Sequence, residues 1–388
     1  MTTKIVLGVS GGIAAYKSVT LLRLLKKSHF EVTVVPTESA LNFVGKPTWE
    51  AISGKEVHSK VFQATNQVLH VKLGQEADLI VVAPATADLL YRAAAGAGND
   101  LLTATLLSSK APVIFFPAMH TEMWEHAATQ ENIATLRNRG HLVIDPVSGE
   151  LTGSDEGIGR MPEPEQIHAL IKTFLAKPGV KQDLKGKRVL VTLGGTSESI
   201  DPIRVITNKS SGEMGSAIVR AAQLRGATVS AIVGNTNTVL PTAERLISVT
   251  DTNSMSEALA TEAKMADLII MAAAISDFRP RQNLEKLERS NTQSIELDAT
   301  EDLLLNLTNN RRPGQTIVGF AAVTSDLLLN AQQKLAKKGC DLIVGNLIND
   351  QQGFGDLQTE IILVSKSAVI ESGVVTKNQA AHLILDNC

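Results

Sequence analysis

Two short glycine turns have the residue types that bind phosphate. Ser10-Gly11-Gly12 follows the apolar run Lys4–Val9, and Gly194-Gly195-Thr196 follows Arg188–Thr192. A glycine turn between a strand and a helix presents backbone N–H groups to phosphate oxygens. Ser10 and Thr37 would add hydroxyl donors, and ordinary turn chemistry is the alternative role for both. We therefore expect a monophosphate site beside the first turn.

Both turns lack the features of a dinucleotide site. Neither contains the spaced third glycine, and the second strands end in Pro36-Thr37 and Gly234-Asn235 rather than in an acidic residue for a ribose hydroxyl. The sequence therefore argues against an NAD-dependent oxidoreductase. A further anion-binding segment is Asn208–Gly212 (NKSSG), which opens a helix in the second half. Arg204, just upstream, is a candidate ligand for a carboxylate or phosphate.

The elements that position these turns recur in both halves of the chain. Ala77–Asp88 (ADLIVVAPATAD) returns as Ala266–Asp277 (ADLIIMAAAISD). Each copy is an apolar run without alternation, which is typical of a strand buried on both faces of a parallel sheet. The pattern predicts an α/β protein with two Rossmann-like, doubly wound parallel-sheet domains. It indicates shared architecture more than shared function.

Strands and helices are expected to alternate along the chain. The predicted strands are 4–9, 31–35, 79–83, 113–116, 141–144, 189–192, 228–233, 268–272, 316–320, 342–344 and 360–364. The predicted helices are 14–27, 48–53, 87–94, 130–139, 215–226 and 254–264. Because residues 175–187 are polar and contain Pro178 and Gly179, we place domains at 1–178 and 188–388, joined by a linker at 179–187.

Composition predicts a folded protein without a strong overall charge. The chain is 44% hydrophobic and has a net charge of −3, so we expect no nucleic-acid or membrane partner. Cys340, Cys388 and the eight histidines lack the spacing of a zinc site. No signal peptide or membrane-spanning apolar run is evident, so a cytoplasmic location is expected.

Several ordered segments resemble those of one enzyme family. They are VSGGIAAYK (9–17), APATADL (83–89), GNDL (98–101), PAMHTEMW (117–124), DPIR (201–204), TNKSSGEMG (207–215), AAAISDFR (272–279) and GFAA (319–322). The first half resembles the flavin-dependent cysteine decarboxylases. Nearly the whole chain resembles the bacterial bifunctional phosphopantothenoylcysteine decarboxylases and phosphopantothenate–cysteine ligases of coenzyme A biosynthesis. The resemblance implies a flavodoxin-like fold for the first domain.

For the first domain, the resemblance implies FMN and the decarboxylation of phosphopantothenoylcysteine to 4′-phosphopantetheine. FMN would oxidise the thiol end of the substrate and later return the electrons, so that CO2 leaves without net redox change. His70, His120 and Ser154 are the implied catalytic candidates, and Ala118 and Met119 the substrate contacts. The residues expected around the flavin are Ser10, Gly11, Gly12, Thr37, Pro84, Thr86 and Asn99.

For the second domain, the resemblance implies ligation of cysteine to 4′-phosphopantothenate, with CTP as cosubstrate, Mg2+, and an acyl-cytidylate intermediate. Arg204, Asn208 and Ala274 match positions that contact the substrate or the intermediate. The positions matched to CTP are Met271, Ala272, Ala273, Asp277, Lys286, Glu301, Asp302, Leu303, Leu304, Phe320, Lys334 and Lys338. Without the resemblance, the lysines near 334–338 would be interpreted as a solvated helix end.

The chain departs from the family pattern at both sites. His120 stands where asparagine is common, and Gly153 where a proton-donating cysteine is common, which leaves Thr152, Ser154, Asp155 or water as the donor. In the second domain, Glu288 places a negative charge in a usually lysine-rich loop, and Ser197 and Val323 replace an arginine and a glutamate. A degenerate decarboxylase domain, or a flavin-binding regulatory protein without turnover, is the alternative. The family's trimeric decarboxylase and paired ligase contacts imply a homo-oligomer, a dodecamer.

Overall fold

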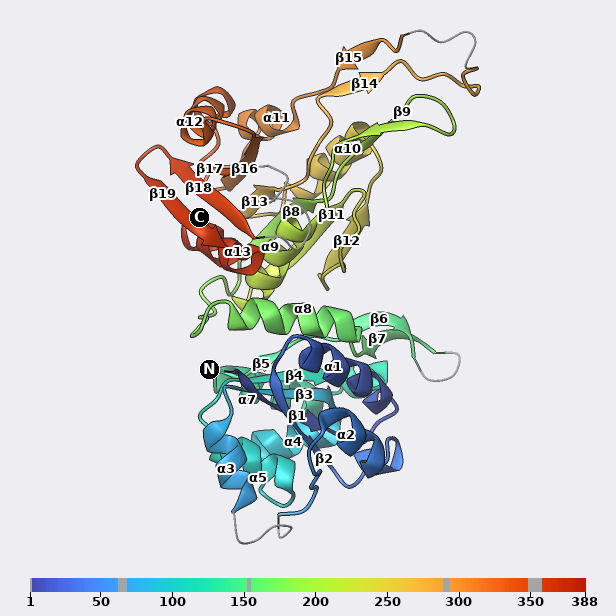
Figure 1. The fold of residues 1–388 in the computed structure, drawn as a ribbon, viewed down its shortest axis with the longest axis vertical. Helices are drawn as coiled ribbons and strands as arrows, with labels where there is room; N and C mark the ends of the chain where they lie inside the picture. Colours follow the sequence, from blue (N-terminus) through green and yellow to red (C-terminus); the bar gives the residue numbers. More distant parts are fainter. Residues whose placement is uncertain (1, 62–67, 152–154, 289–293, 348–357) are drawn as a thin grey trace. The chain divides into compact units, whose positions relative to one another are not determined.

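The chain forms two compact units, Met1–His168 and Ala169–Cys388 (Figure 1). The computed structural model describes residues 2–61, 68–151, 155–288, 294–347 and 358–388. None of the helices within those ranges is long and apolar enough to cross a membrane. Helix α8 (Pro164–Leu175) contains the boundary between the units.

The first unit contains a five-stranded parallel sheet in the order β2-β1-β3-β4-β5. Its strands are β1 (Lys4–Val9), β2 (Glu31–Pro36), β3 (Leu79–Ala85), β4 (Val113–Pro117) and β5 (Leu142–Val143). This is the flavodoxin-like strand order, in which the direction of winding reverses between β1 and β3. The carboxyl ends of these two strands are where α/β proteins with this winding usually bind ligands. The predicted fold class is confirmed for this unit.

Helices cover both faces of the first sheet because its strands are apolar on both sides. All seven residues of β3 are buried. One face packs against α4 (Ala87–Ala95), α5 (Leu101–Ser108) and α7 (Ala127–Asn138), and α1 (Ala15–Lys27) packs on β1, β2 and β3. The remaining elements are η1 (Ala40–Asn42), α2 (Lys46–Ser53), α3 (Leu69–Glu76), α6 (Thr121–Glu125) and the hairpin β6 (Val147–Glu150) and β7 (Glu156–Arg160).

The second unit contains an eight-stranded sheet in the order β12-β11-β8-β13-β16-β17-β18-β19. The strands from β12 to β17 are parallel, whereas β18 and β19 are antiparallel to their neighbours. Their bounds are β8 (Arg188–Leu193), β11 (Thr228–Val233), β12 (Arg245–Ser248), β13 (Leu268–Met271), β16 (Thr316–Val323), β17 (Leu342–Leu347), β18 (Thr359–Ser365) and β19 (Val369–Val375). The doubly wound prediction is confirmed, but the expectation of a wholly parallel sheet is corrected at this edge, because β18 returns directly beside β17.

Two cores cover the two faces of the second sheet. Val189 and Val191 of β8 pack with α9 (Glu213–Leu224) and α13 (Lys377–Asp386). Leu190, between them, packs with α10 (Thr252–Glu262), α11 (Leu303–Asn309) and α12 (Leu327–Lys338). Alternate residues of one strand thus enter different cores, which explains the continuous apolar runs in the sequence.

Two small antiparallel pairs complete the second unit. They are β9 (Ser197–Ser199) with β10 (Val205–Thr207), and β14 (Phe278–Pro280) with β15 (Leu297–Ala299). In Figure 1 both pairs extend beyond the large sheet of this unit. None of these four short strands was predicted, because each is only three residues long and none is an apolar run.

Candidate functional sites

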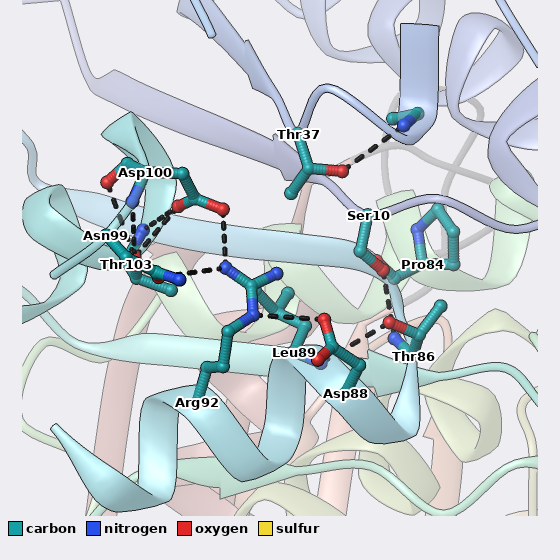
Figure 2. Close-up of polar contacts among 11 residues, drawn as sticks. Ser10, Thr37, Pro84, Thr86, Asp88, Leu89, Arg92, Asn99, Asp100 and Thr103 are labelled. Atoms are coloured by element: carbon teal, nitrogen blue, oxygen red, sulfur yellow. Dashed lines mark hydrogen bonds and ion pairs between the residues drawn. The ribbon is translucent and has the colours of Figure 1, made fainter. Parts of the chain in front are cut away.

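Ser10 joins the carboxyl ends of β1 and β3 in the first unit (Figure 2). Its hydroxyl donates to the carbonyl oxygen of Pro84 at 2.8 Å and accepts from the N–H of Thr86 at 2.9 Å. A serine hydroxyl has a single hydrogen. Because that hydrogen is donated to Pro84, Ser10 positions the loop after β3 in the free protein, and its expected contact with phosphate stays a prediction.

Donors for an anion remain next to Ser10. The N–H groups of Gly11, Gly12 and Ile13 have no acceptor within the described part of the chain. Thr37 is 5% exposed, and its hydroxyl oxygen accepts from the N–H of Ala40 at 3.2 Å, which leaves its own hydrogen to donate. These groups fit a phosphate held by backbone amides and one hydroxyl.

The two glycines of the first turn differ in the space around them, and only Gly11 cannot accept a larger residue without rearrangement. A Cβ atom on Gly11 would lie 2.3 Å from the Cβ of Ser39, in the segment after β2. A Cβ atom on Gly12 would meet only the methyl group of Thr86, at 3.5 Å. Gly11 is therefore required by close approach of two loops, whereas Gly12 borders open space beside α4.

Arg92 holds the segment that contains Asn99. Its guanidinium group donates to Asp88 at 3.0 Å, to Asp100 at 2.5 Å and to the side-chain oxygen of Asn99 at 3.4 Å (Figure 2). Burial opposes the charge of Arg92, but Asp100 and Asp88 outweigh it and raise its pKa. Asp100 also caps α5 together with Thr103. Sequence reasoning missed Arg92, although its spacing of four residues from Asp88 on a helix is a detectable signal.

His70 lies in the first turn of α3 with a buried, unpaired ring nitrogen. Its Nδ1 has no hydrogen-bond partner among the described residues, and its carbonyl oxygen accepts from Ser108 at 3.0 Å. Gly74 brings α3 against α5, since a Cβ atom there would lie 2.8 Å from the Ser108 hydroxyl oxygen. Leaving a buried polar group unpaired costs about 1–3 kcal/mol. The nitrogen is therefore suited to a partner that binds from outside the chain.

The segment around His120 is attached to the β6–β7 hairpin. The N–H of Met119 donates to the carbonyl of Gly159 at 3.0 Å, and the Thr121 hydroxyl donates to that of Ile158 at 2.9 Å. The Nδ1 atom of His120 lies 3.7 Å from a carboxylate oxygen of Asp155. The N–H of Ala118 donates to the carbonyl of Ala85, the last residue of β3, at 3.1 Å. Ser154, the third catalytic candidate, lies outside the described residues.

The second unit contains a cavity of about 570 Å3 at the carboxyl ends of its parallel strands. Its lining brings together segments that are far apart in the sequence. The predicted residues that line it are Asn208, Met271, Ala272, Ala273, Ala274, Asp277, Glu301, Asp302, Leu303, Leu304, Phe320, Lys334 and Lys338. Sequence reasoning missed other lining residues, namely Asn346, Thr359 and Lys377.

The second glycine turn does not form this cavity. The N–H of Gly195 donates to the carbonyl of Asn235 at 2.9 Å, and the N–H of Thr196 donates to that of Ala274 at 3.3 Å. Gly194 has a φ of 82°, a conformation that favours glycine. The turn thus joins three strand ends. In the sequence β9 and β10 stand between it and α9, but a Cβ atom on Gly212, the N-cap of α9, would lie 3.3 Å from the nitrogen of Gly194. Asn208–Gly215 lines the cavity, and the expected role of the glycine turn in receiving phosphate stays a prediction.

A cationic end of the cavity is formed by α12. Lys338 forms an ion pair with Asp302, the N-cap residue of α11. Burial raises the pKa of Asp302, but Lys338 and the N–H of Leu305 outweigh it and hold that pKa below its usual value. Burial, together with the charge of Lys338, lowers the pKa of Lys334. A desolvated ammonium group beside another cation gains strongly from an arriving anion.

Arg204 and Lys286 lie outside the lining of this cavity. Arg204 follows β9 and donates to Asp201 at 2.6 Å and to the carbonyl of Leu287 at 3.1 Å. Asp201 is 1% exposed and also accepts from backbone N–H groups of Ile203, Arg204 and Leu287. Burial opposes the Asp201 charge, but these bonds lower its pKa. Arg204 and Lys286 thus belong to the segments that form the small pairs β9–β10 and β14–β15, and not to the cavity.

Comparison with known proteins identifies relatives over most of the chain. The family model "Flavoprotein" matches residues 1–176, and "DNA/pantothenate metabolism flavoprotein C-terminal domain" matches residues 184–388. The coenzyme A biosynthesis bifunctional protein CoaBC of Mycobacterium tuberculosis is 48% identical, over 90% of this chain and 87% of its own length. The CoaBC protein of Vibrio vulnificus is 41% identical, over 93% of this chain and 90% of its own length. A crystal structure of the C-terminal domain of a CoaBC protein is 34% identical over 53% of this chain and 95% of its own, with a TM-score of 0.46.

Proposed function

Because the chain belongs to the CoaBC family of bifunctional coenzyme A biosynthesis enzymes, we propose that its second unit ligates cysteine to 4′-phosphopantothenate with CTP and that its first unit decarboxylates the product. The observation that carries this proposal is the cavity of the second unit. It gathers an acidic residue, an aromatic side chain and paired lysines from separate segments, as a nucleotide and an activated acyl group require.

In the ligase unit, the lysines at the α12 end would bind the CTP triphosphate. Lys334 and Lys338 would neutralise charge that develops as pyrophosphate leaves. Mg2+ in such sites is usually held by one or two carboxylates together with substrate phosphates, and Asp277 lines the cavity as the candidate ligand. Asn208 donates to the carbonyl of Ile275 at 3.0 Å, which holds its amide at the rim for contact with the acyl group.

In the decarboxylase unit, the first glycine turn and Thr37 would hold the FMN phosphate. When bound, the flavin would supply the redox chemistry that lets the cysteinyl carboxylate depart as CO2 while its bonding electrons stay on the substrate. The protein positions the substrate and moves protons. His70 presents an unpaired buried nitrogen for this purpose, and His120 and Asp155, paired at 3.7 Å, are proposed to orient the carboxylate and deliver the late proton.

We further propose a cytoplasmic homo-oligomer, with trimeric decarboxylase contacts and paired ligase contacts that close as a dodecamer. Arg204 and Lys286, which do not line their own chain's cavity, would then act across the ligase pair. Gel filtration with light scattering tests the assembly, and a monomer at micromolar concentration would contradict it. Cys340 and Cys388 are both free thiols, as a reducing compartment permits.

The purified protein should convert 4′-phosphopantothenate, cysteine and CTP with Mg2+ into 4′-phosphopantetheine, CMP, pyrophosphate and CO2. It should also show a flavin absorption spectrum. Mass spectrometry of the products and a pyrophosphate assay measure the two halves separately. Phosphopantothenoylcysteine as the end product would contradict the decarboxylase assignment. A yellow protein that forms neither product would instead indicate a flavin-binding protein without turnover.

The KM for CTP should rise as the pH is raised, and the rise should begin below the pH at which an ordinary lysine loses its proton. The lowered pKa of Lys334 means that its ammonium group loses its proton early. Since the triphosphate binds the charged form, the KM should rise about tenfold per pH unit above that pKa. Initial rates of pyrophosphate release measure it. Lys334→Arg should flatten the profile because a guanidinium group stays charged, and an equal rise in that variant would contradict the assignment.

A further inference from the structure

The segment 273–277, which lines the cavity of the second unit and ends at Asp277, is held by hydrogen bonds to its main chain. Thr300 donates twice, from its hydroxyl to the carbonyl of Ser276 at 2.5 Å and from its N–H to the carbonyl of Asp277 at 3.0 Å. The N–H of Ser276 donates to the hydroxyl oxygen of Thr196 at 2.9 Å. The groups that hold Ser276 therefore decide where the neighbouring carboxylate of Asp277 lies.

Thr196 is the first member of a buried chain of hydrogen bonds. The Thr252 hydroxyl donates to a carboxylate oxygen of Glu198 at 2.7 Å, because an ionised carboxylate only accepts. A hydroxyl group has a single hydrogen, so the contact of 3.4 Å between the hydroxyl oxygens of Thr196 and Thr252 must use the hydrogen of Thr196. The bonds thus run in one direction, from the N–H of Ser276 through two hydroxyl groups to Glu198. Hydrogen bonds arranged in this way polarise and strengthen one another.

Glu198 ends this chain as a buried carboxylate without a cation. The residue is 6% exposed and forms no ion pair within the described ranges. Thr252 is the first residue of α10, and its N–H donates to the same Glu198 oxygen at 3.0 Å. The N-terminus of a helix attracts negative charge, so α10 provides a favourable site for the carboxylate. Because a buried carboxylate costs free energy unless it is hydrogen-bonded, Glu198 and Thr252 hold each other in place.

We infer that the chain of Thr196, Thr252 and Glu198 positions the ligase site. Acting through Ser276, these three residues hold Asp277 in place for the metal-bound triphosphate of CTP. This inference rests on the proposed ligase function, in which Asp277 is the candidate Mg2+ ligand. None of the three residues lines the cavity, so their effect on the reaction is exerted through the cavity wall at Ser276. A misplacement of about 1 Å can lower a rate about a hundredfold, even when its cause lies away from the reacting atoms.

Thr196→Val and Thr196→Ser test the hydroxyl group of Thr196 in the full-length enzyme. Valine keeps the shape of the side chain but deprives the N–H of Ser276 of its acceptor, whereas serine keeps the hydroxyl group. Thr196→Val should lower kcat for pyrophosphate release about ten- to a hundredfold, with the KM for 4′-phosphopantothenate within about twofold of the wild-type value. Thr196→Ser should recover most of the rate. Equal rates in the two variants, or a change in the KM for 4′-phosphopantothenate alone, would overturn the inference.

Glu198→Gln removes the charge at the end of the chain and keeps the shape of the side chain. The amide oxygen still accepts from Thr252, but a bond to a neutral acceptor is about half as strong as one to a carboxylate. We expect kcat for pyrophosphate release to fall about three- to tenfold, while added phosphopantothenoylcysteine is decarboxylated at the wild-type rate. Glu257→Gln is the matched control, because Glu257 is exposed on α10 and does not line the cavity. An unchanged kcat in Glu198→Gln, or an equal fall in the two variants, would overturn the inference.

Titration calorimetry with CTP requires no turnover. With Mg2+ present, Thr196→Val should bind CTP about tenfold more weakly than the wild type, because the Asp277 carboxylate is displaced from the metal. With EDTA present, the two proteins should bind CTP equally, because only the metal contact depends on Asp277. Equal losses under both conditions would overturn the inference. A wild type that binds CTP with Mg2+, with the loss in Thr196→Val, but releases no pyrophosphate would retain the positioning chain and refute the ligase reaction.

Discussion

His70→Asn is expected to stop the decarboxylase at phosphopantothenoylcysteine while the ligase continues. Removing a group that transfers or orients a proton typically lowers the rate about 10²- to 10⁴-fold. The buried Nδ1 atom of His70 has no partner within the described residues, so few internal bonds depend on it. FMN should remain bound, because the Gly11–Ile13 amides and Thr37 are unchanged. Product analysis by mass spectrometry and the flavin spectrum measure both effects.

His29→Asn is the matched control for this variant. His29 is exposed and has a φ of 61°, a conformation that asparagine adopts readily, so its activity should equal that of the wild type. Asp155→Asn should slow 4′-phosphopantetheine release less than His70→Asn, because a neutral amide can still hydrogen-bond to His120 but cannot donate a carboxyl proton. If His70→Asn retains full decarboxylation, the assignment of His70 to the reaction is wrong.

Lys338→Gln is expected to raise the KM for CTP about a hundredfold. The lysine neutralises Asp302 at the cavity wall, and its removal both deletes a cation and leaves a carboxylate facing the triphosphate. The deletion of the cation and the repulsion from the carboxylate should each raise the KM for CTP about tenfold. Steady-state rates of pyrophosphate release at varied CTP measure the change, with 4′-phosphopantothenate and cysteine held at saturation.

Asp302→Asn separates the two contributions. Asparagine caps a helix as well as aspartate does, so the bond from the N–H of Leu305 to the N-cap residue of α11 should persist. The double variant Asp302→Asn with Lys338→Gln should therefore recover about tenfold in the KM for CTP compared with Lys338→Gln alone. Lys366→Gln, at an exposed site outside the cavity, should behave as the wild type. No recovery in the double variant would show that repulsion by Asp302 is not a cause.

The sequence alone predicted the doubly wound architecture, but not the antiparallel direction of β18 and β19 or the four short strands. Continuous apolar runs such as Leu79–Ala85 and Leu268–Met271 are strands buried on both faces, and each lies at the centre of a doubly wound sheet. The pattern is readable because burial on both faces demands apolar residues at every position. Most segments expected around CTP also line one cavity, since they follow the carboxyl ends of neighbouring parallel strands.

The tertiary structure decided what each polar side chain is free to do. Ser10 reads as a phosphate donor in the sequence, but its hydrogen is committed to Pro84, which is 74 residues away. The second glycine turn likewise bonds to Asn235 and Ala274. Glu198 and Thr252 have no local pattern that marks them, yet they form a buried hydrogen bond across 54 residues. Composition and periodicity report burial, whereas the availability of a hydrogen bond depends on partners that only the folded chain brings within 3 Å or so.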